Sequence, residues 1–173
     1  MKLYLHSLSR KAGHSCTVGF FIEQNTKSLI YPLRSININY YIPFTMKTKS
    51  TDGIKINVET HYKSKQSHPL ASHYFFAYRI TIKNISDYTV QLKKRHWYIF
   101  DFNGIKSEVE GDGVIVIQPI LVPDQSYQYV SGCNLITDMG KMHGIYLMKR
   151  EIDEKLFNVK IPEFLMIVPY KLN

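Results

Sequence analysis

Residues 54–62 read IKINVETHY, and apolar and polar side chains alternate along them. Ile54, Ile56 and Val58 share one face of an extended chain, and the residues between them share the other. Residues 74–83 read YFFAYRITIK and alternate in the same way, after a polar loop that contains a proline. This two-residue period predicts two half-buried β-strands, because successive side chains of a strand point to opposite faces of a sheet.

Similar segments follow to the end of the chain, and no segment has the period of a helix. Further strands are expected at residues 88–102, 105–110, 114–117, 142–148, 157–161 and 164–168, with another beginning at Tyr127. The alternation changes phase within residues 88–102. A β-bulge near residues 94–96, or burial on both faces, would explain that change. Asn103-Gly104 then fits a hairpin turn, which needs positive φ angles.

These segments predict an all-β fold, an antiparallel β-sandwich of the immunoglobulin or fibronectin-III kind. Trp97 is the only tryptophan of the chain and lies in the middle of the third predicted strand. We expect it between the two sheets, because a large aromatic side chain at such a position fills a core. Tyr78, Ile80 and Phe164 are predicted to form the structural core with it.

Residues 1–45 differ from the rest of the chain, since they show no sustained apolar period. Three interpretations are open: a disordered basic tail, an organelle transit peptide, or upstream sequence added by an early start codon. We favour the last, because Met46 directly precedes the regular pattern. The predicted organisation is therefore an unpatterned tail over residues 1–45 and one domain over residues 46–173.

The composition excludes several classes of protein. The chain has 173 residues, 45% of them hydrophobic, which suits one domain with a core. No apolar run approaches the roughly 20 residues of a membrane helix, so no membrane insertion is expected. Half of the net charge of +8 comes from residues 1–45, so the domain is only mildly basic and no nucleic-acid partner is expected. Two cysteines, Cys16 and Cys133, are too few for a disulfide scaffold, and a reducing, cytoplasmic compartment is the default.

The order of these segments resembles that of the ApaG family. The resemblance rests on an ordered set of short stretches: residues 78–84 (YRITIKN), 90–97 (VQLKKRHW), 109–114 (VEGDGV), 118–119 (QP), 123–126 (PDQS), 129–132 (YVSG), 140–148 (GKMHGIYLM) and 161–164 (IPEF). It covers residues 53 to about 171 and implies a fibronectin-III-like β-sandwich. Proteins of this family are often named for cobalt and magnesium efflux. Related domains in eukaryotic F-box and polymerase-interacting proteins resemble protein-binding modules.

The resemblance and the residues together favour a non-enzymatic ApaG-domain binding module. The expected partner is another protein, which the sequence does not identify, bound by the loops or by an exposed sheet edge. No cofactor is expected. The alternative is an accessory factor in divalent-cation (Co²⁺/Mg²⁺) homeostasis that binds a cation, phosphate or pyrophosphate. Any efflux role would be indirect, because a domain without a membrane-spanning segment provides no path for an ion.

Gly111 and Gly113 are the candidate phosphate-binding residues. In similar ApaG proteins this turn carries a GxGxxG motif that has been interpreted as a pyrophosphate cradle. Here Val116 occupies the third glycine position, and residues 114–117 suggest a strand, whereas a dinucleotide fold needs a helix there. We therefore favour a structural turn in which one or both glycines have positive φ.

Glu108, Glu110 and Asp112 are the candidate metal ligands, because they share one face of a predicted strand and carboxylates suit Mg²⁺ and Co²⁺. A solvated face of an edge strand explains them more simply. The histidines of the patterned region form no His-x-His or His-x₃-His pair. A divalent cation is accordingly expected to bind weakly if it binds at all.

No catalytic residue is predicted. Ser131 lacks the Gly-x-Ser-x-Gly nucleophile elbow and the helix that follows it. Cys133 fits a small core residue better than a nucleophile. His96, next to Trp97, is interpreted as a buried histidine that holds a loop carbonyl.

Overall fold

A computed structural model describes residues 20–21, 46–114 and 117–172 of the chain. Its strands are β1 (Phe20–Phe21), β2 (Met46–Thr51), β3 (Ile54–Tyr62), β4 (Tyr74–Asn84), β5 (Val90–Asp101), β6 (Lys106–Asp112), β7 (Ile120–Leu121), β8 (Ser126–Leu135), β9 (Met139–Arg150) and β10 (Leu156–Ile167). Three short 3₁₀ helices are η1 (Ser64–Gln66), η2 (Pro69–Ala71) and η3 (Pro169–Lys171). Within these residues, none of the helices has the length and apolar character needed to cross a membrane.

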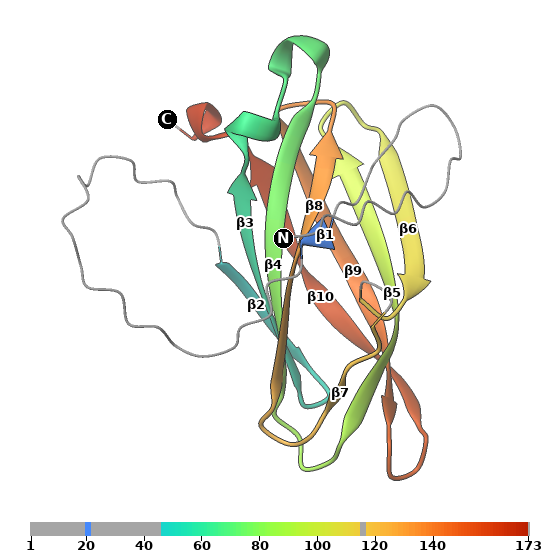
Figure 1. Cartoon of the computed structure of the whole chain (residues 1–173). Coiled ribbons are helices and arrows are strands. Elements are labelled where there is room, and N and C mark those ends of the chain that lie inside the picture. Colours follow the sequence, from blue (N-terminus) through green and yellow to red (C-terminus); the bar gives the residue numbers. More distant parts are fainter. Residues whose placement is uncertain (1–19, 22–45, 115–116, 173) are drawn as a thin grey trace, which may run out of the picture.

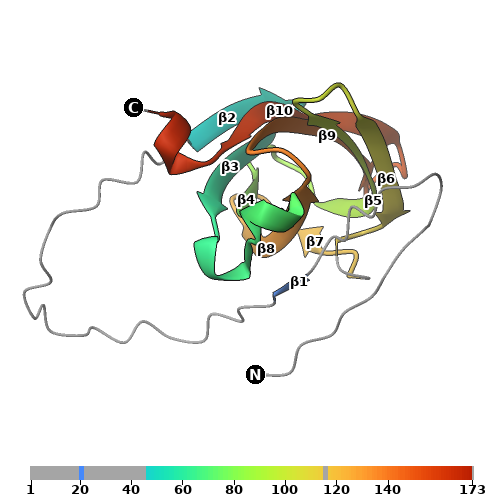
Figure 2. The ribbon, with the colours of Figure 1, turned by 90° about the horizontal axis from the view of Figure 1, so that it is seen from above.

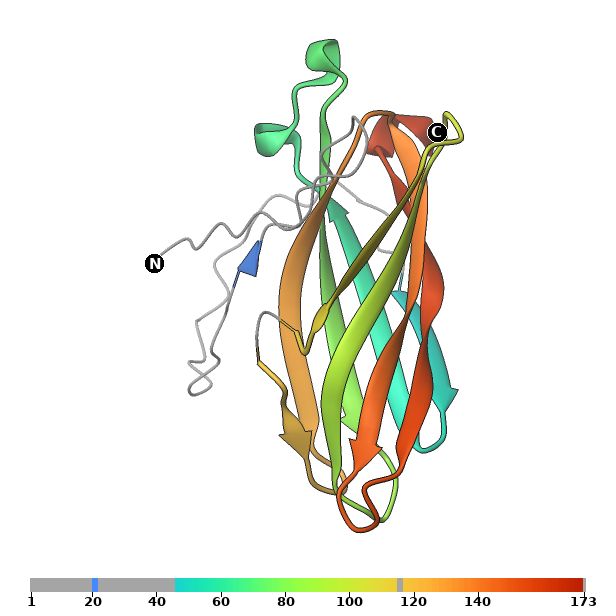
Figure 3. The same ribbon diagram turned by 90° about the vertical axis from the view of Figure 1, so that its right-hand side faces the viewer.

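The strands form two antiparallel sheets around one core (Figure 1). The first sheet has the order β1-β8-β4-β3-β2, and the second has the order β10-β9-β5-β6, with β7 paired to β5. Seen from above, the two sheets curve around a shared interior (Figure 2). From the side, the long strands of both sheets run along one axis of the domain (Figure 3). This architecture confirms the predicted all-β antiparallel sandwich.

Strand β5 contains the predicted bulge, but at an earlier position. Its pairing with β9 shifts register between Leu92 and Lys94. Val90 and Leu92 face the core before the shift, and Trp97 faces it afterwards. The extra residue reverses the side-chain alternation, so the bulge explains the phase change that was placed near residues 94–96.

Residues 157–161 and 164–168, predicted as two strands, belong largely to the single strand β10. A second bulge between Ile161 and Phe164 shifts its pairing with β9 without ending it. Pro162 lies at this bulge and has no amide hydrogen for the ladder, which an edge strand such as β10 tolerates. The proline therefore interrupts the apolar pattern but not the strand.

The strand predicted at residues 114–117 is also wrong. Val114 and Ile117 pair with each other as an isolated bridge, through backbone hydrogen bonds of 2.8 and 3.0 Å. Val114 and Ile117 therefore pair with each other instead of extending as one strand, and residues 115–116 between them lie outside the described residues. Val114 itself is fully buried, which accounts for part of the apolar character of this segment.

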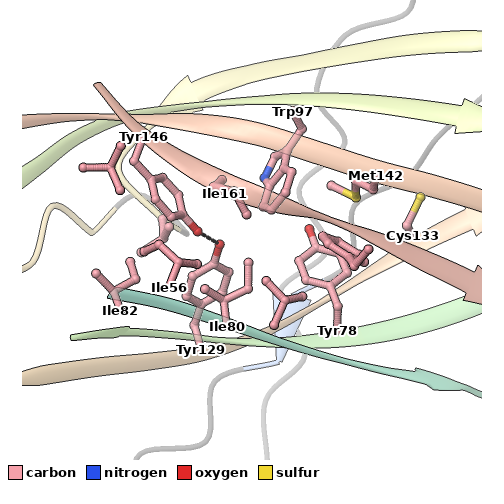
Figure 4. Close-up of a cluster of buried hydrophobic side chains, with 14 of the residues drawn as sticks. Ile56, Tyr78, Ile80, Ile82, Trp97, Tyr129, Cys133, Met142, Tyr146 and Ile161 are labelled. Atoms are coloured by element: carbon pink, nitrogen blue, oxygen red, sulfur yellow. Dashed lines mark hydrogen bonds between the residues drawn. The ribbon is translucent and has the colours of Figure 1, made fainter. Parts of the chain in front are cut away.

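The four residues predicted for the structural core, Trp97, Tyr78, Ile80 and Phe164, are all buried, each with at most 1% of its surface exposed. Trp97 projects from the second sheet toward Tyr78 of the first, as Figure 4 shows. Their ring centroids are 5.6 Å apart in an edge-on arrangement, and the ring of Phe164 lies 6.1 Å from Trp97. Trp97 thus joins the two sheets through aromatic contacts.

Of residues 1–45, the structure describes Phe20–Phe21 alone. This pair forms β1, with Phe20 opposite Ser131 and Phe21 opposite Val130 of β8. The other residues of the predicted tail, Cys16 among them, lie outside the described residues. The interpretation of this segment as an early-start product therefore stays a prediction.

Candidate functional site

The outer face of the second sheet carries a row of stacked rings. His96, Tyr98 and Phe100 of β5 and His143 of β9 form this row, which we call the ring ladder. Their centroids are 4.3 Å apart for His96–Tyr98, 5.0 Å for Tyr98–His143 and 5.5 Å for Phe100–His143. Strand periodicity puts the three β5 residues on one face, and the register places His143 opposite Tyr98. All four side chains are half-buried.

Two lysines cover the Phe100 end of the ring ladder. Lys141 and Lys106 lie on the strands either side of Phe100, directly opposite it in register. Their Nζ atoms are 5.5 and 5.7 Å from the centroid of the Phe100 ring. This is the range of cation–π contact, which is weak at an exposed site. Lys141 also forms an ion pair of 2.9 Å with Glu163 of β10. This end of the ladder therefore has a basic border.

Two of the three predicted carboxylates lie at the other end. Glu108 and Glu110 are exposed on β6, and both contact His96. Glu108 Oε2 is 2.9 Å from His96 Nε2, and Glu110 Oε1 is 3.4 Å from His96 Nδ1. Asp112 is exposed as well, but its register partner is Lys94. The structure thus joins Glu108 and Glu110 to a histidine that was not predicted as their partner.

The interpretation of His96 as a buried histidine is wrong. Its side chain is 27% exposed, and its partners are carboxylates, not a loop carbonyl. The bulge in β5 is the reason, because it turns the even-numbered residues after it toward solvent. Each carboxylate meets a different ring nitrogen, and these nitrogens point in diverging directions. Among residues 20–21, 46–114 and 117–172, no group of three His, Cys, Asp or Glu side chains is placed to hold a metal.

The glycine-rich turn encloses a guanidinium group. Arg95, only 5% exposed, donates from Nη1 to the carbonyl oxygens of Asp112 at 3.2 Å and Gly113 at 2.7 Å. Arg95 lies opposite Gly111, where an added Cβ would approach the guanidinium to 3.1 Å. The Gly113 amide donates to the Lys93 carbonyl oxygen at 2.8 Å. An anion cradle needs converging free amides, whereas this turn directs carbonyls at a cation, so the geometry favours the structural role.

We expect Gly113→Ala to destabilise the fold by more than the about 1–2 kcal/mol of a left-handed alanine. Gly113 has φ +53°, and an added Cβ would lie 2.0 Å from the carbonyl oxygen of Ile117, so the bridge must move as well. Gly104 is the matched control, because it has φ +90° and open space around its Cβ position. Urea unfolding with and without millimolar pyrophosphate measures the effect. Equal losses at both glycines, or a pyrophosphate stabilisation that Gly113→Ala removes, would contradict the structural role.

The weak catalytic candidates lie inside the sandwich. Ser131 and Cys133 of β8 are both fully buried. Ser131 hydrogen-bonds the hydroxyl of Tyr78. Gly132, between them, leaves room for the ring of Phe75, which an added Cβ would approach to 2.3 Å. These residues therefore serve packing, and in this arrangement a substrate reaches neither side chain.

A cluster of buried tyrosines was not predicted as a unit. Tyr129 of β8 and Tyr146 of β9 are joined by a hydrogen bond of 2.5 Å between their hydroxyls, across the core (Figure 4). Desolvation raises the pKa of Tyr78 and Tyr129 well above the ordinary value, and it raises the pKa of Tyr146 too. The positive charge of Arg95 has the opposite effect and lowers the pKa of all three tyrosines. The core thus contains a polar group of phenols that must stay protonated.

Comparisons with known proteins find a matching domain family and similar proteins from that family. The ApaG domain family matches residues 64–150. Protein ApaG of Brucella canis is 48% identical over 124 residues, which are 72% of this chain and 95% of that protein. Protein ApaG of Shewanella denitrificans is 45% identical over 118 residues, 68% of this chain and 93% of that protein.

A solved structure agrees with these matches. The crystal structure of a Bordetella pertussis protein assigned as ApaA is 35% identical and has a TM-score of 0.64. The match covers 73% of this chain and 96% of that one. Family match, sequence identity and fold agree over nearly the full length of these relatives, and the chain therefore belongs to the ApaG family.

Proposed function

We propose that the chain is a non-enzymatic ApaG-domain binding module and that its ring ladder binds another protein. The observation that carries the proposal is the stack of four rings on the solvent side of a sheet. Such a face is usually polar, since the opposite face already contributes to the core. Aromatic side chains are enriched at protein interfaces, where they supply rigid contact area. Tyr98, stacked on both sides, is the centre of this surface.

The charges around the ring ladder support a protein partner. Lys106 and Lys141 border the Phe100 end, and Glu108 and Glu110 border the His96 end. An aromatic centre with a charged rim is the usual anatomy of a protein interface. Opposite charges at the two ends would also orient the partner, because reversing it would place like charges together.

The test uses the full chain as bait in an extract of its native host. We expect one protein to be recovered in stoichiometric amount, and Tyr98→Ala to reduce its recovery at least about tenfold, as loss of an interface hot spot does. Tyr170→Ala is the control, since Tyr170 in η3 is 58% exposed and lies outside the ladder. Thermal unfolding shows whether both variants are folded. Equal recovery by the wild-type chain and Tyr98→Ala would contradict the proposed surface.

The alternative, a cation or phosphate role, makes a different prediction. Mg²⁺ or Co²⁺ would then raise the melting temperature by binding the folded state, and Glu110→Gln would abolish the rise. We expect no saturable shift with Mg²⁺, Co²⁺ or pyrophosphate at micromolar concentration. Such a shift, or metal in the purified protein, would favour the alternative. A cytoplasmic location stays an expectation from the cysteine content.

A further inference from the structure

Without β1, the described sheets would have four long edge strands, β2, β6, β8 and β10, besides the two-residue β7, and three of the four are protected by their sequences. Strands at an edge have unpaired backbone groups, and charges or prolines usually prevent them from pairing with other chains. The three protected edges carry such residues: Lys47 and Lys49 in β2, Lys106, Glu108, Glu110 and Asp112 in β6, and Lys160, Pro162 and Glu163 in β10. These edges therefore need no cover.

The fourth edge, β8, differs from the others. It reads SYQYVSGCNL over Ser126–Leu135, ten residues without a charge or a proline. Strand β4 pairs with one side of β8 along the whole length of β8, from Tyr74 opposite Leu135 to Lys83 opposite Ser126. The other side is an edge that would invite pairing with any extended chain.

Two residues of the chain's own N-terminal part, Phe20 and Phe21, lie on that edge. Phe20 pairs with Ser131 and Phe21 with Val130, near the middle of β8. Residues 17–22 read TVGFFI, which contains no charged residue and is rich in strand-forming types. Within this uncharged, β-prone stretch, Phe20 and Phe21 thus pair in antiparallel register with the edge that no charge or proline protects.

We propose that the β8 edge is a strand-addition site and that the segment around Phe20–Phe21 is its occupant, protecting the domain from pairing with other chains. The affinity comes from backbone hydrogen bonds, which any extended chain could make. The intramolecular segment prevails because it is covalently part of the same chain, which makes its pairing an intramolecular event with a high effective concentration. This inference concerns a different surface from the ring ladder and does not depend on it.

Hydrogen exchange on the full chain tests the proposal. In an antiparallel ladder, adjacent residues direct their amides to opposite sides, so one of Val130 and Ser131 faces β1 and the other faces β4. We expect both amides to be protected in the wild-type chain. With Phe20→Pro and Phe21→Pro together, the amide facing β1 should exchange at least about tenfold faster, because proline lacks an amide hydrogen and disrupts the ladder.

Two controls accompany this measurement. The amide facing β4 should keep its protection, which shows that the sandwich is intact. Lys27→Pro with Ser28→Pro places the same substitutions in the same segment but away from the pair, and should leave both amides protected. Rapid exchange of the β1-facing amide in the wild-type chain, or no change in the Phe20/Phe21 variant, would overturn the proposal. Protection that rises with protein concentration would also overturn it, because a second copy would then be the occupant.

Discussion

Trp97→Ala is expected to lower the free energy of unfolding by about 3–5 kcal/mol, the usual cost of emptying a large aromatic core site. The side chain is 1% exposed and packs edge-on against Tyr78, Tyr146 and Phe164, at centroid distances of 5.6, 6.3 and 6.1 Å. Gly144 on the neighbouring strand lies so close that an added Cβ would approach the indole to 2.9 Å. The site is therefore tightly packed, and its neighbours have little freedom to fill the space.

Urea unfolding of the variant measures the loss, and the adjacent position provides a matched control. Tyr98 follows Trp97 in β5 but faces solvent, so Tyr98→Ala removes a ring of comparable size without opening the core. We expect it to cost about 1 kcal/mol or less, as surface substitutions generally do. A loss below about 1 kcal/mol at Trp97, or equal losses at the two positions, would show that the β5 register is wrong.

Stability is expected to fall steeply above about pH 10, because three buried phenols must stay protonated in the folded state. Desolvation raises the pKa of Tyr78, Tyr129 and Tyr146, whereas in the unfolded chain a tyrosine ionises near its ordinary value of about 10. Above that pH the unfolded state loses protons that the folded state retains, so unfolding becomes more favourable as pH rises. The stability that these protonated phenols contribute is fully present below pH 10. Above pH 10, each phenol lowers the free energy of unfolding by up to about 1.4 kcal/mol per pH unit. The three phenols together lower it by up to about 4 kcal/mol per pH unit.

Urea unfolding at pH values from about 8 to 11, together with tyrosinate absorbance, measures this dependence. Tyr146→Phe removes one titrating group and should reduce the slope by about one third. Absorbance should show that these three phenols ionise only as the chain unfolds. Their ionisation near pH 10 with the fold intact would mean that the tyrosine cluster is open to water.

Local alternation was enough to predict the outline of the fold. Strand β3 begins at Ile54, and β4 spans Tyr74–Asn84, close to the ranges expected from their two-residue period. Trp97 was placed in the core because it is a large aromatic residue in the middle of a predicted strand, and it is buried. A period reports which face of a strand is buried, and this information is contained within a few neighbouring residues.

Bulges limited what alternation could determine. The bulge in β5 was recognised from its phase change, but its position between Leu92 and Lys94 depends on pairing with β9. Residues between the expected and the actual position of the bulge are assigned to the wrong face, since the bulge reverses the side-chain alternation. This is why His96 was predicted in the interior and Arg95 was not identified as the buried cation of the glycine turn.

The fold class and the core residues could be predicted from local patterns of apolar residues, whereas the domain boundary near residue 46 stays a prediction. Which distant residues meet depends on how the strands pair in the two sheets. Strand register alone places His143 opposite Tyr98, Glu110 opposite His96 and Phe20 opposite Ser131. Register is set by pairing along whole strands and by the bulges within them, and no single segment contains that information. The ring ladder and the covered β8 edge are therefore properties of the assembled sheets.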